Sequence, residues 1–279
     1  MVHPRGAHDI DVGADELAEC LIIVPAFNEE STLPRVLYDL RRVLPGADIV
    51  VVDDGSTDGT ASVVPDSVAL LRLPFNLGIG GAMQAGYRYA HGLGYRIAVQ
   101  VDGDGQHQAE EVDKLIAALK RTGADLVIGS RFLERGSYRQ SPAREIGSVL
   151  LRGAIRLVSR VSLTDCTSGF RAANGRAIEL FAHWYPDDYP EPEVAALLVR
   201  NGCRVVEVPA RMNPRTGGRS SITLAAGLVY VAKVGIALFL DVFRNPWKGA
   251  GLDRLQPARA EAPASSTEAE AAGAWERAR

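Results

Sequence analysis

The sequence predicts an α/β protein whose mostly parallel sheet is flanked by helices, and three observations lead to this expectation. Short apolar runs rich in β-branched residues, such as Cys20–Ala26 and Asp48–Asp54, alternate with segments of helical pattern through the first 130 residues. Such alternation is typical of a parallel sheet with helices on both faces. The 279 residues, 47% hydrophobic and 23% charged, suffice for one large core and exclude a disordered, collagenous or disulfide-scaffold protein.

The expected elements follow one another along the chain. Strands are predicted over Cys20–Ala26, Asp48–Asp54, Val68–Leu73, Ile97–Asp102 and Asp125–Gly129. Helices are predicted between them over roughly 32–43, 77–93 and 109–121. After residue 130 the pattern predicts a basic helix over 141–161, a loop or short strand over 166–173, a helix over 193–201 and a strand over 204–210.

Composition divides the chain into four parts. Residues 1–19 form a polar, acidic extension without the apolar stretch of a secretion signal, so we expect the protein to stay in the cytoplasm. Residues 20–221 form the main domain, whose pattern changes after residue 130. Residues 222–248 read as an apolar helix, and residues 249–279, rich in Ala, Pro, Ser and Glu, are expected to be a disordered tail.

The formal net charge of −3 hides two opposite halves. Residues 1–130 hold 10 Lys and Arg against 19 Asp and Glu, a net of −9, whereas residues 131–279 hold 21 against 15, a net of +6. The acidic first half, together with the absence of a nucleic-acid motif, argues against a nucleic-acid partner. Arg152, Arg156 and Arg160 form one stripe of the basic helix, which suits either solvent or an anionic membrane surface.

Polar residues follow the expected strands of the first half at the point where each strand ends. Ligands of open α/β sheets bind outside the carboxyl ends of the strands, so these residues predict a polar ligand at one edge of the sheet. They are Asn28 and Glu29, Asp53 and Asp54, Asn76, Asp102 and Asp104, and Ser130 and Arg131.

The segment Asp102-Gly-Asp-Gly-Gln-His107 has the chemistry of a divalent metal site. Two carboxylates two residues apart, after an apolar strand and with glycines in the turn, offer hard oxygen ligands to Mg²⁺ or Mn²⁺. A calcium-binding EF-hand loop fits poorly because His107 stands where that loop requires Gly. A plain polar turn is the structural alternative.

Two further loops are ambiguous when each is taken alone. Asp53 and Asp54 supply acceptors for ribose hydroxyls or a base N–H, or simply form a turn. The glycines around Gly80 open a predicted helix and suit either an anion bound to backbone N–H groups or close packing. The segment matches neither a dinucleotide-binding fingerprint nor a P-loop, because Met83 stands in the third glycine position.

Six segments, taken together and in order, resemble the family 2 glycosyltransferases of GT-A fold. They are VPAFNEE, VVDDGSTDGT, NLGIGGA, VDGDGQH, GSR and SGFRA, and the resemblance covers roughly residues 20–220. The Gln-His pair after the second Asp, SGFRA and a later Gly-x-Arg-Ser resemble the branch that transfers a sugar to polyprenyl or dolichyl phosphate. The resemblance implies a Rossmann-like GT-A sheet with C-terminal amphipathic interface helices.

The resemblance also implies a role for each matching residue. Residues 20–130 would be the half that binds nucleotide and metal, and residues 131–221 the acceptor half. The nucleotide would contact Pro25, Asn28, Glu29, Asp53, Asp54, Gly80 and Asp102. A divalent cation, Mg²⁺ or Mn²⁺, would be held by Asp102, Asp104 and Gln106. The catalytic residues would be Asp104, Arg131, Arg171 and Glu193, and the acceptor phosphate would meet Arg131, Arg171, Arg215 and Arg219.

Two glutamates in the later half have more than one interpretation. In relatives that attack with a hydroxyl group, an acidic residue in this region serves as the base, so Glu191 or Glu193 would take that role here. A positioning role, or an interaction with Arg215 or Arg219, is equally open.

The apolar segment 222–243 contains one charged residue, Lys233, before Asp241. Its length is enough to span a bilayer, but the central Lys233 favours a helix lying in the membrane interface. Packing against the core or in a homo-oligomer is the third interpretation. We therefore expect a cytoplasmic protein peripherally associated with the inner face of the plasma membrane.

These expectations combine into a metal-dependent, inverting glycosyltransferase. It would move a sugar from a nucleotide-diphosphate sugar, with UDP as the expected nucleotide, to polyprenyl (undecaprenyl) phosphate. Because a phosphate with a second pKa near 6 is mostly ionised at about pH 7, no strong base would be required. The alternatives are a soluble hydroxyl acceptor, such as a glycan or a natural product, and a nucleotide-binding protein without turnover.

Overall fold

The structure is a computed structural model that describes residues 17–133, 149, 152–153, 156, 163–187, 190–213 and 233–236. Several expectations lie outside the described residues. They concern the extension before residue 17, most of the basic helix at 141–161, Arg215 and Arg219, most of 222–248 and the tail from residue 249.

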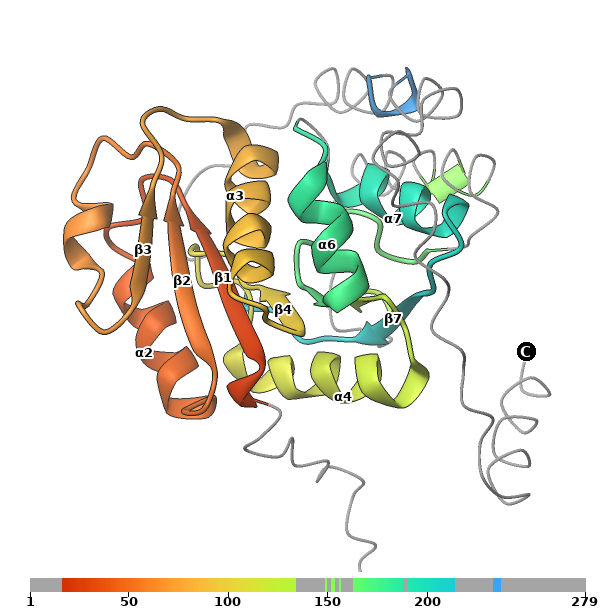
Figure 1. Ribbon diagram of the computed structural model, residues 1–279, viewed down its shortest axis with the longest axis horizontal. Helices are drawn as coiled ribbons and strands as arrows, with labels where there is room; N and C mark the ends of the chain where they lie inside the picture. The colour runs from red at the N-terminus through yellow and green to blue at the C-terminus, as the bar shows by residue number, and fades with distance from the viewer. Residues whose placement is uncertain are drawn as a thin grey trace, which may run out of the picture.

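Seven strands and five α-helices make up the described fold (Figure 1). The strands are β1 (Cys20–Ala26), β2 (Asp48–Asp53), β3 (Ala69–Arg72), β4 (Ile97–Gln100), β5 (Leu126–Ser130), β6 (Arg171–Asn174) and β7 (Val205–Pro209). The helices are α2 (Leu33–Val43), α3 (Gly78–Gly92), α4 (Val112–Thr122), α6 (Gly175–His183) and α7 (Pro190–Arg200). Two 3₁₀ turns, Thr60–Val63 and Ala109–Glu111, complete the described elements.

The strands form one sheet in the order β3-β2-β1-β4-β6-β5-β7. All pairs are parallel except those of β6, which runs antiparallel to both of its neighbours, β4 and β5. Because β4 and β5 are both antiparallel to β6, they run in the same direction as each other. The carboxyl ends of β1 to β5 therefore lie at one edge of the sheet. The prediction of a mostly parallel sheet with its strand ends on one edge is therefore confirmed, with β6 as the antiparallel exception.

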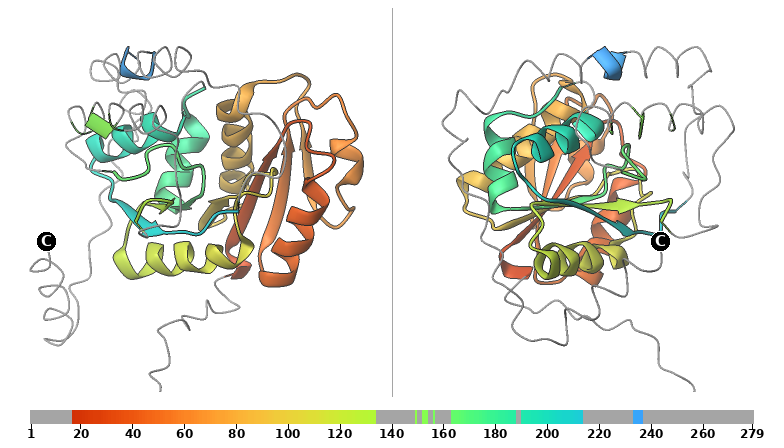
Figure 2. Two further views of the ribbon diagram at one scale, coloured as in Figure 1. Left: turned by 180° about the vertical axis from the view of Figure 1, so that it is seen from behind. Right: turned by 90° about the vertical axis from the view of Figure 1, so that its right-hand side faces the viewer.

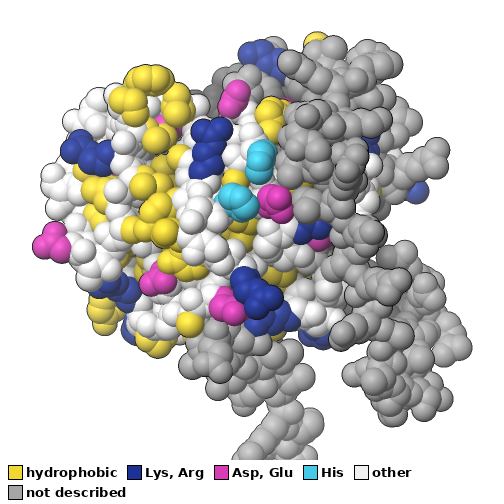
Figure 3. Space-filling view, in the orientation of Figure 1, with side chains coloured by type: hydrophobic (Ala, Val, Ile, Leu, Met, Phe, Trp, Pro, Cys, Tyr) yellow, Lys and Arg dark blue, Asp and Glu magenta, His cyan; other side chains and the backbone are white. Residues whose placement is uncertain are grey.

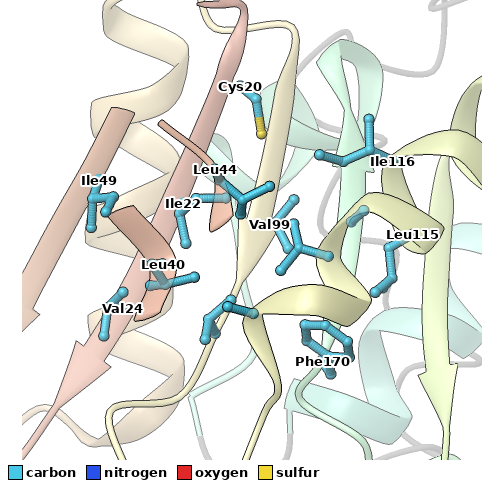
Figure 4. Packing of buried hydrophobic residues seen from close by; sticks show 14 of the residues in the cluster. Cys20, Ile22, Val24, Leu40, Leu44, Ile49, Val99, Leu115, Ile116 and Phe170 are labelled. Atoms are coloured by element: carbon cyan, nitrogen blue, oxygen red, sulfur yellow. The ribbon is translucent and has the colours of Figure 1, made fainter. Parts of the chain in front are cut away.

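Helices cover both faces of the sheet (Figures 1 and 2). Helices α3, α6 and α7 pack on one face, and α2 and α4 pack on the other. Strand β1 shows why its sequence is continuously apolar. Leu21 and Ile23 belong to the core on the side of α3, α6 and α7. Ile22 and Val24 belong to the core on the side of α2 and α4 (Figure 4), and all four residues are at most 1% exposed. Successive side chains of a strand alternate between faces, so a strand covered on both sides needs apolar residues at every position.

Two later helices differ from the expectation. Helix α7 begins at Pro190 rather than at Glu193, since proline is tolerated in a first turn, where the backbone N–H groups have no helical partner. Helix α6 was not predicted at all. Its N-cap is Asn174, whose side chain accepts a hydrogen bond from the backbone N–H of Ala177 at 3.0 Å. This cap is also the last residue of β6, so no separate turn marks where the helix begins.

A short helical segment, residues 233–236 (blue in Figure 1), belongs to the apolar stretch 222–243. Val234 is fully buried and joins the core formed by α3, α6 and α7, whereas Lys233 and Ile236 are exposed. At Val234 the stretch therefore packs against the core. Within the described residues, no helix combines the length and the apolar character that crossing a membrane requires.

Candidate active site

A cavity of about 270 Å³ opens at the carboxyl ends of β1, β2 and β4. Five of the site residues named from the sequence line it: Pro25, Glu29, Asp54, Asp102 and Asp104. The other lining residues are Ala26, Phe27, Asn76, Gly78, Ile79, Ala82 and Gly103. Four segments that are far apart in the sequence thus meet at the edge of the sheet where a ligand was expected.

Asp102 is held from two sides. Its Oδ1 accepts a hydrogen bond from Nε2 of Gln100 at 3.0 Å, and its backbone N–H donates to Nδ1 of His107 at 3.0 Å. His107 is buried and stacks on Phe170 with 4.8 Å between ring centroids. Because Nδ1 is the acceptor, this geometry assigns the proton of the neutral ring to Nε2, which lies 3.7 Å from Oδ2 of Asp102.

Asp104 and Gln106 lie in a tight turn after β4. Oδ1 of Asp104 accepts a hydrogen bond from the backbone N–H of Gln106 at 3.0 Å. Gly105, between them, has a φ of +76°, a conformation that glycine adopts at little cost because it has no Cβ. The turn therefore sets the direction of the Asp104 carboxylate at the cavity wall.

The chain that leaves β7 runs beside this turn. Asn213 donates from its backbone N–H to the carbonyl of Gln106 at 2.8 Å and from Nδ2 to the carbonyl of Gly105 at 3.2 Å. Its Oδ1 accepts a hydrogen bond from Nε2 of Gln108 at 2.8 Å. Sequence reasoning missed Asn213 because its side-chain partners lie more than 100 positions away along the chain, and no local sequence pattern reports such contacts.

The two neighbouring aspartates after β2 have different surroundings. Asp53 is 1% exposed, accepts a hydrogen bond from the backbone N–H of Ser56 at 3.0 Å and lies 3.5 Å from Nε of Arg72. Asp54 lines the cavity and accepts from the backbone N–H of Leu77 at 2.7 Å. Burial raises the pKa of Asp54, and the hydrogen bond from Leu77 opposes that rise. Asp54 thus lines the cavity, whereas Asp53 stabilises the turn that follows β2 through its hydrogen bond with Ser56.

Besides Asp53, two residues expected to contact a nucleotide, Asn28 and Gly80, do not line the cavity. Asn28 directs its Oδ1 to the backbone N–H of Thr57 at 2.9 Å. Gly80 packs closely against the backbone of the segment that follows α6, because a Cβ at this position would lie 2.1 Å from the carbonyl oxygen of Pro186 and 2.4 Å from that of Asp187. This contact fits the close-packing interpretation of Gly80 rather than anion binding.

Arg131 donates to a buried carboxylate that sequence reasoning did not name. Nε and Nη2 of Arg131 each donate to Asp165 at 2.7 Å, and Nη2 also donates to Oγ1 of Thr167 at 2.8 Å. Asp165 is 1% exposed, and its loop is held by Glu207 of β7, which accepts from the backbone N–H groups of Thr164 and Asp165 at 2.7 Å. The bidentate geometry fixes the orientation of the guanidinium.

Arg171 lies at the start of β6 and is 1% exposed. Its Nε donates to the carbonyl of Ser168 at 2.7 Å, and its Nη2 donates to the carbonyl of Glu191 at 2.7 Å. Among the described residues, Nη1 has no hydrogen-bond partner. The guanidinium therefore joins the SGFRA segment to the first turn of α7.

Glu191 and Glu193 both lie in the first turn of α7, in different surroundings. Glu193 is 7% exposed. Burial raises the pKa of Glu191, Arg171 opposes the rise and Asp102 adds to it. Glu191 is thus coupled electrostatically to Asp102 of the cavity and to Arg171.

The exposed histidines of the described residues lie away from the cavity. His91 and His183, near the ends of α3 and α6, have ring centroids 6.0 Å apart. Figure 3 shows two histidine side chains (cyan) side by side on one face of the molecule. Neither lines the cavity. Within the residues that the structure describes, no group of three His, Cys, Asp or Glu side chains is placed to hold a metal ion on its own.

Comparison with known proteins identifies the family. The model of the family described as "Glycosyl transferase family 2" matches residues 21–181. The chain therefore belongs to family 2 of the glycosyltransferases, and it is a glycosyltransferase.

Two curated relatives and one solved structure add to this. The chain is 35% identical to the undecaprenyl-phosphate mannosyltransferase of Micrococcus luteus, over 77% of this chain and 91% of that protein. It is 32% identical to the polyprenol monophosphomannose synthase of Mycolicibacterium smegmatis, over 81% of this chain and 90% of that protein. Glucosyl-3-phosphoglycerate synthase of Mycobacterium tuberculosis, solved with Mn²⁺, UDP and phosphoglyceric acid, has a TM-score of 0.62 and 22% identity, over 85% of this chain and 84% of that one. This likeness shows a GT-A-like fold.

Proposed function

We propose that this glycosyltransferase moves a sugar from a nucleotide-diphosphate sugar to a polyprenyl phosphate, with a divalent cation and with inversion at the anomeric carbon. The observation that carries the proposal is the cavity at the strand ends, where Asp102 and Asp104 stand beside Asp54 and Glu29. The names of the two curated relatives support a lipid phosphate as the acceptor.

Asp102, Asp104 and Gln106 would hold Mg²⁺ or Mn²⁺. Their oxygen atoms suit either ion, and the Asp102 side chain lines the cavity and is 34% exposed. The remaining ligands would be diphosphate and water oxygens. A bound cation would neutralise charge on the leaving diphosphate. Solved structural neighbours contain Mn²⁺ or Mg²⁺ together with UDP, which supports this proposal.

The nucleotide would lie against Pro25, Glu29 and Asp54, which line the cavity. Asp54 has carboxylate lone pairs beyond the one that Leu77 occupies, so it can still accept from a ribose hydroxyl or a base N–H. Asp53, Asn28 and Gly80 would act by shaping these loops. We keep UDP as the expected nucleotide.

The acceptor phosphate would approach from the side of β5 and β7. Arg131, oriented by Asp165, would supply positive charge there, and Arg171 would contribute through Nη1. Arg215 and Arg219, which lie outside the described residues, complete the proposed acceptor set. The contacts of Asn213 support this arrangement, because they place the chain two residues before Arg215 next to the Asp104 turn.

In the reaction, an ionised oxygen of the acceptor phosphate would form a bond to the anomeric carbon while the bond to the leaving diphosphate oxygen breaks. No proton has to be removed from the attacking oxygen, because the phosphate is mostly ionised at about pH 7. The charge that develops on the leaving group would be stabilised by the cation and by nearby guanidinium groups. Asp104 would act through the cation.

The lipid acceptor leads us to propose a peripheral location at the cytoplasmic face of the plasma membrane. Residues 20–221 would be the catalytic domain, with its nucleotide and metal half at 20–130 and its acceptor half at 131–221. Residues 222–248 would contact the anionic membrane surface or a second copy of the chain. Val234 shows one packing contact of this segment with the domain itself.

The test is a transfer assay with purified protein, Mn²⁺, a panel of UDP- and GDP-sugars, and undecaprenyl phosphate or a soluble alcohol as acceptor. We expect a glycosylated lipid phosphate by product mass, and no product with EDTA. Product on the soluble alcohol alone would refute the lipid acceptor. Binding of a nucleotide sugar without any transfer or hydrolysis would support a binding protein instead.

A hydroxyl acceptor is the second candidate, and the raised pKa of Glu191 is the observation in its favour. A buried carboxyl with a raised pKa is better suited to take a proton near neutral pH. If Glu191 is a general base, Glu191→Gln lowers kcat by about 10² to 10⁴-fold. If the acceptor is a phosphate, the loss stays below about tenfold. Glu193→Gln, on the same helical turn, tests the other candidate base in the same way.

A further inference from the structure

We infer that Asn28 is a positioning residue: it locks the loop after β1 to the loop after β2, and it does not itself bind the nucleotide. The inference rests on the proposed function, since the purpose of the lock is to present the neighbouring residues to the donor. It departs from the role of nucleotide ligand that the family resemblance implies for this position.

The backbone of Asn28 is the first observation. Its φ is +58°, and among the described residues it is the one residue other than glycine with a positive φ. Asparagine tolerates this left-handed conformation better than most residues, whereas in alanine the contact between Cβ and the backbone raises the conformational energy. The conformation turns the chain sharply between the end of β1 and the start of α2.

Hydrogen bonds between the two loops are the second observation. Oδ1 of Asn28 accepts from the backbone N–H of Thr57 at 2.9 Å, and the backbone N–H of Asn28 donates to Oγ of Ser56 at 3.0 Å. The next residue continues the ladder, because the backbone N–H of Glu29 donates to Oγ1 of Thr60 at 2.8 Å.

Glu30, the third residue in this series of hydrogen bonds, both donates to and accepts from the loop after β2. Glu30 donates from its backbone N–H to Oδ2 of Asp58 at 3.3 Å and accepts at Oε2 from the backbone N–H of Gly59 at 3.0 Å. A Cβ at Gly59 would lie 2.6 Å from Oε1 of Glu30, so the fit is close. The Ser-Thr-Asp-Gly-Thr segment is thus occupied by the neighbouring loop along its whole length.

The cavity wall is the fourth observation. Phe27 and Glu29, on either side of Asn28, line the cavity, and Asn28 does not. The left-handed turn therefore places the residues on either side of Asn28 at the cavity wall and directs the side chain of Asn28 to Thr57. A change at Asn28 should act on nucleotide binding through Phe27 and Glu29.

Three substitutions separate the backbone contribution from the side-chain contribution. Asn28→Asp keeps an acceptor for Thr57 and tolerates the left-handed conformation, but it removes the amide as a donor. Asn28→Gly keeps the conformation and loses the acceptor. Asn28→Ala loses both. Thr57→Ala is the matched control, because it removes only the longer contact of Oγ1 at 3.3 Å and leaves the backbone N–H in place.

Two measurements are made on each variant: amide hydrogen exchange of residues 56–60, and calorimetric binding of UDP and of GDP with Mn²⁺. We expect Asn28→Asp and Thr57→Ala to stay within about threefold of the wild type in both, Asn28→Gly to lose about fivefold, and Asn28→Ala to lose about tenfold or more. Exchange protection and nucleotide affinity should fall together.

Either of two results overturns the inference. A tenfold loss of nucleotide affinity in Asn28→Asp with normal exchange protection would show that the Asn28 amide is itself a ligand. Unchanged protection of residues 56–60 in Asn28→Ala would show that the lock does not exist. If the wild type binds neither UDP nor GDP, the proposed function fails, and the exchange measurement still decides whether Asn28 locks the two loops.

Discussion

The first and second halves of the described chain use their charged side chains in opposite ways. In the first half, Asp54, Asp102 and Asp104 line the cavity. In the second half, Arg131 is bound bidentately by Asp165, and Arg171 is buried with two of its donors on backbone carbonyls. The net charges of −9 and +6 therefore do not translate directly into two ligand-binding surfaces.

The difference has a physical cause. A carboxylate can be satisfied by one or two backbone N–H groups and still offer lone pairs to a ligand, as Asp54 and Asp104 do. A buried guanidinium has five N–H donors to satisfy, and leaving them unpaired is costly. Internal acceptors around Arg131, and around Nε and Nη2 of Arg171, meet part of that demand and at the same time orient these groups.

The largest expected effect is on catalysis, at Asp104. Asp104→Asn should lower kcat by about a thousandfold, because an amide holds a divalent cation poorly. Stability should change by less than about 0.5 kcal/mol, since the side chain accepts a single hydrogen bond and remains partly exposed. Transfer rates with Mn²⁺ and a urea unfolding curve measure the two quantities. Full activity with Mn²⁺ would remove Asp104 from the metal site.

A substitution of Arg171, unlike that of Asp104, should lower the stability of the fold substantially. Arg171→Met leaves the carbonyls of Ser168 and Glu191 without their donors, and it should lower the free energy of unfolding by about 3 kcal/mol. Arg200→Met, an exposed arginine at the end of α7, is the control and should cost about 0.5 kcal/mol or less. Equal effects of the two substitutions would contradict an internal role for Arg171.

The pairing of Arg131 with Asp165 can be measured directly. A double-mutant cycle with Arg131→Met and Asp165→Asn should give a coupling energy of about 2 kcal/mol, because the carboxylate is buried and the contact is bidentate. Urea unfolding of the four proteins supplies the numbers. A coupling energy near zero would mean that Arg131 is available to a ligand at no internal cost.

Glu191 gives a pH-dependent effect whose sign is fixed. Its pKa is raised by burial above the ordinary 4.5, so ionisation disfavours the folded state. The wild type should lose stability relative to Glu191→Gln as the pH rises from below 4.5 through the folded-state pKa. Unfolding curves between about pH 4 and pH 8 measure this difference. If the free energy of unfolding of Glu191→Gln minus that of the wild type stays constant or decreases as the pH rises, the prediction is contradicted.

The smallest expected effect is at Asn213. Asn213→Ala removes two side-chain hydrogen bonds to the Asp104 turn and should cost about 1 kcal/mol of stability. The half-saturating Mn²⁺ concentration should rise about threefold, because the turn is held less firmly. Asn201→Ala, at the end of α7, removes a comparable contact with the carbonyl of Leu197 and should leave the Mn²⁺ dependence unchanged.

Most of the first half could be predicted from its local pattern. The alternation of apolar strands and helices places the five strand ends, and Asp54, Asp102 and Asp104 follow from their position after those strands. The second half could not be predicted to the same depth. Helix α6 follows β6 without a turn, and Asp165 stands just before the segment 166–173, whose pattern predicts only a loop or a short strand.

The sequence by itself determined the fold class, the family and the edge of the sheet where the carboxylates gather, because each depends on spacing along a strand or a short motif. Only the tertiary structure decided what the side chains do there. It turned Asn28 to Thr57, joined Arg131 to Asp165, placed Asn213 beside Gly105 and set Glu191 in electrostatic contact with Asp102. These contacts join residues far apart in the chain, and hydrogen bonding and desolvation depend on distances in space that no local pattern records.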